Sequence, residues 1–411
     1  LSAMASSCDA CSPEPHPVNT HSDPLIVATA QLARVQLLAG LVVQALESFH
    51  DAAAAGHPGG VKAHLPLLTE VAERFTAIGD HREEIQRWQD IAAHLGEETP
   101  EWVYHKLSDA YTQNTSGFGG SLEENHVWGD CDKHAILSWL HRWLQPSLYL
   151  EIGVDRGASL ACAAGLAIGV DPRPGLRLSQ PLPLQSTIMA CSSDEFFRGE
   201  AVSLLQPAPE LIFIDGMHLF EFALRDFIRC ECFAAPWSLI VIDDIYPCHP
   251  VQAQRRRGSV SWTGDVWKLH SILQELRPDL TLMALNAETT GLLLIAGLNP
   301  ASTTLSTAYK KIVAQYRHDC APPEAVLART GAMPSDHPFV PVLLTLLRQA
   351  RHEGSSSAEL QSALQLLKPG LASIRGKAGR PDPFSKHRCQ LLEPPSAFLS
   401  ERPGKGLDLL G

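Results

Sequence analysis

The fold class follows from one stretch of sequence, Tyr149-Leu-Glu-Ile-Gly-Val-Asp-Arg-Gly-Ala-Ser159, in which a strand runs into a glycine turn and then a helix. Glycine is needed where the backbone turns sharply and a ligand approaches without a Cβ in the way, so Gly153 and Gly157 predict a ligand-binding loop. The following strand ends in Asp171, twenty residues after Glu151, where a carboxylate can accept hydrogen bonds from both hydroxyls of a ribose. The stretch therefore predicts a site for a nucleoside-containing cofactor.

Short apolar runs recur on both sides of this stretch and alternate with segments of helix length. Strands that are apolar on both faces and separated by helices are typical of a doubly wound, mostly parallel sheet. The last two runs are joined by the short segment Asn286–Gly291, which predicts an antiparallel hairpin at one edge of the sheet. The expected strands are 148–152, 167–170, 211–214, 239–242, 280–285 and 291–295.

The composition of the chain predicts five segments. Residues 1–24 are expected to form a disordered leader, and residues 369–411, rich in Pro, Gly, Lys and Ser, a disordered tail. Residues 25–124 have helical periodicity and predict an all-helical domain, while residues 125–300 contain the predicted sheet. Residues 301–368 return to helices. Within these segments we expect helices at 133–144, 305–316 and 342–351.

Part of the helical domain, from Phe75 to Tyr111, resembles the helical hairpins of tetratricopeptide repeats. It departs from them because Ser108 stands where glycine is usual and no second copy recurs at a fixed period. Plain antiparallel helices packed on each other explain the pattern as well, and we favour them. Either arrangement offers a surface for a second copy of this chain or for another protein.

The composition also limits the class of partner. The 45% hydrophobic and 19% charged residues are typical of a soluble globular protein, and the net charge of −12 provides no basic field for a nucleic acid. We therefore expect a small-molecule substrate. The longest nearly uncharged apolar run, 158–170, is shorter than the roughly 20 residues that cross a bilayer, so no membrane span is expected. Ten mostly isolated cysteines suit reduced thiols and predict a cytoplasmic protein.

Carboxylates follow two of the predicted strands. Asp215 comes after the run 211–214, and Asp243 and Asp244 come after the run 239–242. Ligands of open α/β sheets bind outside the carboxyl ends of the strands, and neighbouring strands lie about 4.8 Å apart, so the three acids would converge. Oxygen ligands of this kind suit Mg²⁺. Capping of the following turns is the alternative role for each aspartate.

His218 lies three residues after Asp215, where an imidazole that titrates near neutral pH can take a proton from a substrate hydroxyl. A lone histidine is more often a surface or capping residue, but beside the acids it is a candidate general base. Three arginines, 255–257, follow the second acidic strand. They would either grip an acidic substrate or form a solvated run of charge, and the latter is the commoner case.

Residues 151–157 resemble motif I of class I S-adenosylmethionine-dependent methyltransferases, E-x-G-x-x-x-G. The resemblance implies a Rossmann-like methyltransferase sheet in which the loop formed by Glu151, Gly153 and Gly157 holds the methionyl part of the cofactor. It further implies that Asp171 holds the ribose, and that Ser193 and Asp194 lie where the family contacts adenine. A dinucleotide site would need G-x-G-x-x-G, and the third glycine is missing here.

The segment from Asp215 to Asp226, Asp-Gly-Met-His-Leu-Phe-Glu-Phe-Ala-Leu-Arg-Asp, resembles the D-G-x-H pattern of the small-molecule, macrocin-type sugar O-methyltransferases. That resemblance implies a divalent metal on Asp215, Asp243 and Asp244, with His218 as the general base toward a small-molecule or sugar hydroxyl. The sequence departs from the pattern at Phe220, where tyrosine is usual. The similarity covers the central domain alone. A nicotinamide (NAD)-dependent oxidoreductase and a non-catalytic interaction protein are the alternative functions.

Overall fold

The computed structural model describes residues 64–175, 182–183, 185–368 and 390–394, with the shorter N-terminal pieces 29, 31–34, 36, 42–54 and 62. The predicted leader, and all of the predicted tail except 390–394, lie outside the described residues. The chain divides into two compact units between Arg74 and Phe75. None of the helices in the described residues is long and apolar enough to cross a membrane.

The described part of the first unit is helical, with α2 over Val42–Ala54 and with α4, Leu65–Ile78, reaching across the division between the units. Apolar residues four apart lie on one face of each helix, so Ala45 and Phe49 of α2 are buried, as are Leu68 and Ala72 of α4. The periodicity of the sequence predicts helices at these positions.

A second helical hairpin opens the larger unit. It consists of α5, His81–Leu95, the 3₁₀ turn Gly96–Glu98, and α6, Glu101–Gln113. The hairpin belongs to the unit that contains the sheet, whereas the sequence predicted a domain boundary at residue 124. Polar contacts connect α6 to the start of α8, Ser193–Arg198. Glu101 accepts from the backbone and hydroxyl of Ser192, and the Tyr104 hydroxyl donates to Asp194 at a distance of 2.9 Å.

The sheet has seven strands in the order β4-β3-β2-β5-β6-β9-β7, and all neighbours are parallel except β9, which runs antiparallel to β6 and β7. Each strand is buried along its whole length, except β4 at one edge, so the predicted doubly wound α/β sheet with an antiparallel hairpin at its other edge is present. The direction of strand order reverses between β2 and β5, and this switch point is where such sheets bind ligands. The strands are β2 Tyr149–Ile152, β3 Ala167–Val170, β4 Ser186–Met189, β5 Leu211–Ile214, β6 Leu239–Ile242, β7 Thr281–Leu285 and β9 Leu292–Ala296.

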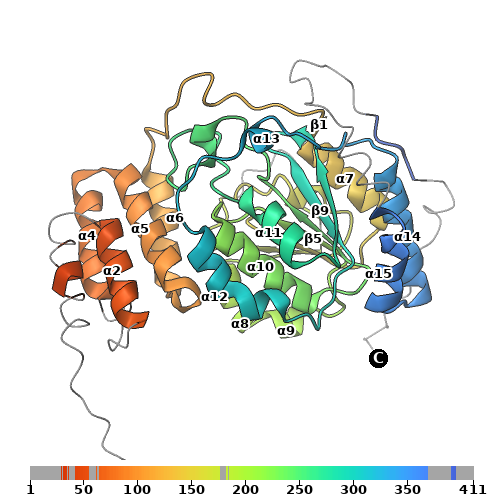
Figure 1. Cartoon of the computed structure of the whole chain (residues 1–411), viewed down its shortest axis with the longest axis horizontal. Coiled ribbons are helices and arrows are strands. Elements are labelled where there is room, and N and C mark those ends of the chain that lie inside the picture. Colours follow the sequence, from red (N-terminus) through yellow and green to blue (C-terminus); the bar gives the residue numbers. More distant parts are fainter. Residues whose placement is uncertain are drawn as a thin grey trace, which may run out of the picture. The chain divides into compact units, whose positions relative to one another are not determined.

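Helices cover both faces of this sheet (Figure 1). Alternate strand residues point to opposite faces, so Ile212 and Ile214 pack under one helix layer while Leu211 and Phe213 pack under the other. The first layer contains α8 Ser193–Arg198, α9 Ala201–Leu204, α10 Phe220–Phe233, α11 Lys268–Leu276 and α12 Thr304–Tyr316. The second contains α7 Lys133–Leu144, α14 Phe339–Glu353 and α15 Ser357–Gln365.

Smaller elements complete the unit. A short parallel pair joins β1, Cys131–Asp132, to β8, Ala287–Glu288. The prediction of a helix directly after the glycine turn was wrong, because that segment contains only the 3₁₀ turn Leu160–Cys162. Leu160 packs in the core beneath the sheet, and strand β3 already begins at Ala167. The segment between them is therefore too short for a full helix. The other short elements are the 3₁₀ turn Pro250–Ala253 and α13, Glu324–Leu327.

Candidate active site

A cleft of about 240 Å³ lies at the carboxyl ends of the parallel strands, beside the switch point. Several parts of the chain line it, and three of them contribute predicted or aromatic site residues. The ends of β2 and β3 contribute Gly153 and Asp171, the loop after β5 contributes Asp215 and His218, and α6 contributes Tyr104 and other side chains along one face. The glycine turn and the acid after β5 therefore open onto the same cleft.

The glycine turn is held by backbone contacts that the sequence alone did not reveal. Gly153 has φ +90°, and a Cβ there would lie 2.1 Å from the carbonyl oxygen of Asp215, so glycine is required where the ends of β2 and β5 pass each other. The Asp171 carboxylate accepts hydrogen bonds from the N–H groups of Val154, at 3.1 Å, and Asp155, at 3.0 Å. Asp171 thus fixes the turn and also lines the cleft, whereas Gly157 lies in the turn but does not line it.

Glu151 lies beneath the glycine turn and not in the cleft. Its carboxyl is fully buried and accepts hydrogen bonds from the hydroxyls of Tyr149 and Ser159, each at a distance of 2.6 Å. Burial raises the pKa of Glu151 to about 8, because it outweighs the two hydrogen bonds that stabilise the charged form. Glu151 therefore supports the loop from below, and the structure does not bring it into contact with the cleft.

The two residues predicted near adenine have different surroundings. Ser193 lines the cleft at the start of α8. Asp194 is turned into the protein, where both carboxylate oxygens accept from Arg225 over 2.7 Å and one also accepts from Tyr104. Asp194 therefore joins α6, α8 and α10, and the structure does not place it against the cleft. Asp226, which does line the cleft, has a pKa raised to about 7 by burial.

The acids after β5 and β6 do not all meet at one point. Lys133, the first residue of α7, places its ammonium 3.1 Å from Asp215 and 2.5 Å from Asp243. The other oxygen of Asp243 accepts from the Asp244 N–H and from the Thr290 hydroxyl. Asp243 is therefore occupied by protein donors, and the predicted set of three carboxylates is not assembled.

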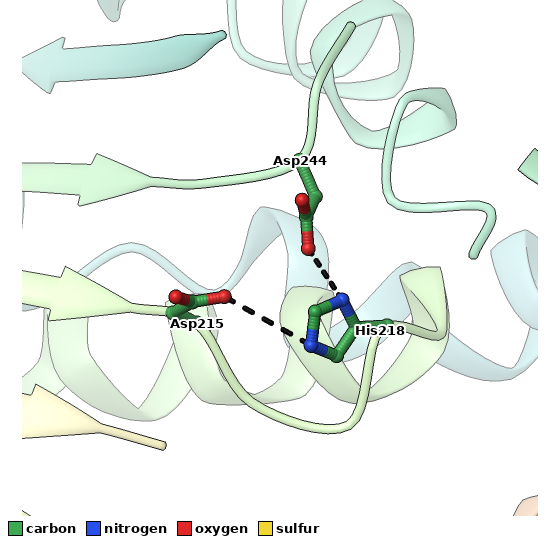
Figure 2. A group of neighbouring side chains, drawn as sticks. All are labelled: Asp215, His218 and Asp244. Carbon is green, nitrogen blue, oxygen red and sulfur yellow. Dashed lines mark ion pairs between the residues drawn. The ribbon is translucent and has the colours of Figure 1, made fainter. Parts of the chain in front are cut away.

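His218 instead stands between Asp215 and Asp244 (Figure 2). Its Nδ1 forms an ion pair with Asp244, and its Nε2 lies 4.0 Å from Oδ1 of Asp215. The imidazole stacks on Trp262 with 5.2 Å between ring centroids. Gly264 permits this arrangement, because a Cβ there would lie 1.6 Å from the carbonyl oxygen of His218.

The charges of this group are coupled. Burial opposes the charged imidazolium of His218, but the carboxylates of Asp244 and Asp215 outweigh it and raise the pKa of the histidine. Burial likewise disfavours the Asp244 carboxylate, yet His218 and Lys133 together hold its pKa below the ordinary value. Burial raises the pKa of Asp215 to about 7, even though Lys133 opposes the change. The Asp244 carboxylate thus stabilises the imidazolium form of His218, which makes the neutral imidazole a stronger base.

The arrangement offers a donor set for a divalent cation. Ligand atoms of Asp215, His218 and Asp244 all lie within 4.8 Å of one another. Two carboxylates and one imidazole suit ions such as Mn²⁺, Fe²⁺ or Zn²⁺ as well as Mg²⁺, whereas the predicted all-oxygen set favoured Mg²⁺. The residues therefore fit a divalent ion, with His218 in the place where the sequence suggested Asp243.

Several residues in the cleft or bound to its acids were missed by sequence reasoning. Lys133 lies 82 positions before Asp215 and starts a helix whose local pattern shows only an apolar face. Tyr104 and Tyr111 belong to a helix assigned to a separate domain, but both line the cleft. Arg257, in contrast, was offered by the sequence as a contact for an acidic substrate, and it lines the cleft together with Trp262.

No family model and no curated protein matches this chain. Similar solved structures include the O-methyltransferase TomG from Streptomyces achromogenes, involved in tomaymycin synthesis, in complex with S-adenosylmethionine (15% identity, 40% of this chain, 78% of that chain, TM-score 0.29). An O-methyltransferase from Bacillus cereus with S-adenosylhomocysteine is also similar (11% identity, 51% and 98%, TM-score 0.30). So is the MycE methyltransferase of mycinamycin biosynthesis with Mg and S-adenosylhomocysteine (17% identity, 55% and 62%, TM-score 0.28).

Proposed function

We propose that this chain is an S-adenosylmethionine-dependent methyltransferase that methylates a hydroxyl group of a small-molecule acceptor, such as a sugar. One observation carries the proposal. The glycine turn after β2, which resembles a cofactor loop, and His218, a candidate base, line the same cleft at the switch point of the sheet.

The charges that line the cleft favour this cofactor over a dinucleotide. The lining contains four aspartates, Asp155, Asp171, Asp215 and Asp226. Carboxylates attract the sulfonium and ammonium groups of S-adenosylmethionine, but they repel a pyrophosphate. In the proposed complex Asp171 accepts hydrogen bonds from the ribose hydroxyls, because a carboxylate has lone pairs beyond those it shares with the glycine turn.

S-adenosylmethionine supplies an electrophilic methyl group on a positively charged sulfur. In the proposed reaction, the acceptor hydroxyl lies against Nε2 of His218, because Nδ1 is taken by Asp244. The step starts from the neutral imidazole of His218, with its proton on Nδ1 toward Asp244. The proton of the hydroxyl passes to the lone pair of Nε2 as the hydroxyl oxygen bonds to the methyl carbon, and the C–S electron pair stays on the sulfur. The Asp244 carboxylate then stabilises the imidazolium, as the orienting acid of a catalytic triad does.

Assistance by a divalent metal is a further part of the proposal. Asp215, His218 and Asp244 would hold the ion, which would lower the pKa of a bound hydroxyl and fix its direction. A histidine that serves as a ligand through Nε2 is no longer free to act as the base. The metal-assisted and the base-assisted forms therefore assign different roles to His218, and removal of metal distinguishes them.

A thermal-shift screen with S-adenosylmethionine, S-adenosylhomocysteine and NAD, each with and without Mg²⁺, tests the cofactor class. We expect both adenosyl compounds to raise the melting temperature and NAD to leave it unchanged. Stabilisation by NAD alone would overturn the proposal in favour of an oxidoreductase. A panel of phenols and hydroxylated sugars, assayed by release of S-adenosylhomocysteine, then tests for turnover. The His218→Ala variant should keep the thermal shift and lose the turnover.

A further inference from the structure

The three consecutive arginines after β6 have three different environments. Arg255 is held inside the protein by the carboxylates of Glu221 and Asp265. Arg256 is exposed and pairs with Glu83. Arg257 is half-buried and forms no ion pair with a carboxylate in the described ranges 64–175 and 185–368. The three arginines therefore do not share one role: they neither all bind a substrate nor all lie in solvent.

Arg257 lies in an aromatic setting beside the candidate base. Its guanidinium stands 4.2 Å from the ring centre of Phe118, 5.6 Å from Trp262 and 5.8 Å from Tyr111. One amino group donates to the carbonyl of Val260 over 2.9 Å, which fixes the plane of the guanidinium. Trp262 also stacks on His218, so the ring of Trp262 contacts both Arg257 and the candidate base.

Arg257 separates two cavities. It lines the 240 Å³ cleft that contains His218, and it also lines a second cavity of about 190 Å³. Tyr111 faces the first cavity, and its hydroxyl accepts from Gln89, which lines the second. The two cavities are therefore adjacent, with Arg257 and Tyr111 in the wall between them.

The second cavity has a positive and polar lining. Arg82, Arg256 and Arg257 all contribute, and Glu83 is the carboxylate paired with Arg256. Gln86 and Gln89 come from the same face of α5 as Arg82, and the side-chain oxygens of both are buried without a hydrogen-bond partner within the described part of the chain. In a protein whose net charge is −12, this concentration of guanidinium groups is unusual.

We propose that the second cavity binds a phosphate monoester group of the methyl acceptor, with Arg257 as the residue that selects for it. The inference rests on the proposed function. Guanidinium groups bind phosphate oxygens by paired, charge-assisted hydrogen bonds. The three arginines of the lining and the carboxylate of Glu83 leave a net positive charge that is opposite in sign and similar in magnitude to that of a phosphate monoester, which carries about −1.5 to −2 at pH 7. The acceptor hydroxyl would reach His218 on the other side of Arg257.

This assignment gives the α5–α6 hairpin a role in recognition of the acceptor. The polar face of α5 lines the second cavity, and α6 contributes Tyr104 and Tyr111 to the cleft. The hairpin is thus part of the substrate site, which agrees with its place in the same compact unit as the sheet.

Calorimetric titration with inorganic phosphate, in the presence of saturating S-adenosylhomocysteine and at constant ionic strength set with NaCl, tests the proposal. The full chain should show saturable binding. Arg257→Gln should weaken it by about tenfold or more, and Arg257→Lys should restore part of it. Arg82→Gln, at an exposed position, should weaken it less. Arg229→Gln, which removes a half-buried arginine paired with Glu97, serves as the matched control and should bind as the unmodified chain does.

The outcomes separate this inference from the proposed function. Binding of S-adenosylhomocysteine without any binding of phosphate overturns the phosphate site and leaves the methyltransferase proposal standing. Equal binding of phosphate by Arg257→Gln and the unmodified chain, or equal binding of acetate and phosphate, also overturns it. Failure to bind S-adenosylhomocysteine at all overturns the proposed function itself, and with it the acceptor site.

Discussion

His218 pairs with the carboxylate of Asp244 through Nδ1, and its Nε2 lies 4.0 Å from Asp215. The pair joins the loop after β5 to the end of β6, and both of its residues have positive φ, +55° and +66°. Backbone in this region is uncommon for residues other than glycine, and it is often found where a side chain must be directed into a site. The pair therefore has the geometry of a base and its orienting acid.

Replacement of Asp244 by asparagine tests the orienting role. The asparagine keeps the shape but cannot stabilise an imidazolium, so we expect the turnover number to fall by about 10²–10⁴-fold. The affinity for S-adenosylhomocysteine should stay the same, because Asp244 does not line the cofactor cleft. Steady-state kinetics together with calorimetry make the comparison. Loss of turnover and of cofactor affinity in the same proportion would contradict the assignment.

Lys133 is expected to neutralise the negative charge of Asp215 and Asp243. In Lys133→Met the carboxylates of Asp215 and Asp243 face each other without a counter-ion, which should cost about 1–3 kcal/mol of stability. Added Mg²⁺ or Mn²⁺ should raise the melting temperature of this variant more than it raises that of the unmodified chain. Thermal melts of both proteins with the ion and with EDTA measure the difference. Replacement of the exposed Lys310 provides the control. An equal effect of the ion on both proteins would argue against the role of Lys133.

Asp194 should matter for stability and not for the cofactor. Asp194→Asn leaves the buried guanidinium of Arg225 without its carboxylate, which should reduce the free energy of unfolding by about 3–5 kcal/mol. Ser193→Ala should weaken the binding of S-adenosylhomocysteine and leave the free energy of unfolding nearly unchanged, because Ser193 lines the cleft. Urea unfolding and calorimetry separate the two effects. A large loss of cofactor affinity in folded Asp194→Asn would restore the role that the sequence suggested.

The buried carboxyl of Glu151 predicts a dependence of stability on pH. Its pKa is raised from 4.5 to about 8 in the folded state, so folding favours the protonated form. The stabilisation is complete below pH 4.5 and is lost as the pH rises toward 8, with a slope of up to about 1.4 kcal/mol per pH unit. Glu151→Gln should therefore gain stability relative to the unmodified chain across this window. A difference that does not change between pH 5 and 8 would contradict the burial argument.

The central sheet could be predicted from the sequence because its strands carry their signal locally. Leu211–Ile214 and Leu239–Ile242 are apolar at every position, since both faces of the sheet are covered by helices. The aspartates that follow them were placed correctly at one end of the sheet for the same reason. Strand spacing alone also predicted that all three would meet, and they do not, because Asp243 is bound by Lys133, Thr290 and the backbone of Asp244.

The partners of those aspartates could not be predicted in this way. Asp243 faces Lys133, which is 110 residues away in the sequence, and no local pattern links the two. Similarly, the periodicity of α6 showed that the helix has an apolar face, but not that Tyr104 and Leu107 would line the cleft. Contacts between distant segments depend on packing, so the domain boundary and the ligand set were the parts that sequence reasoning missed.

The central claim is that the cleft beside Gly153 binds S-adenosylmethionine or its demethylated product. Isothermal titration of S-adenosylhomocysteine into the full chain and into Asp171→Ala tests this claim most directly. We expect one site on the unmodified chain, no competition by NAD, and an affinity at least about tenfold weaker when Asp171 is replaced. Equal affinity of the two proteins, or displacement of the ligand by NAD, would contradict the proposed site.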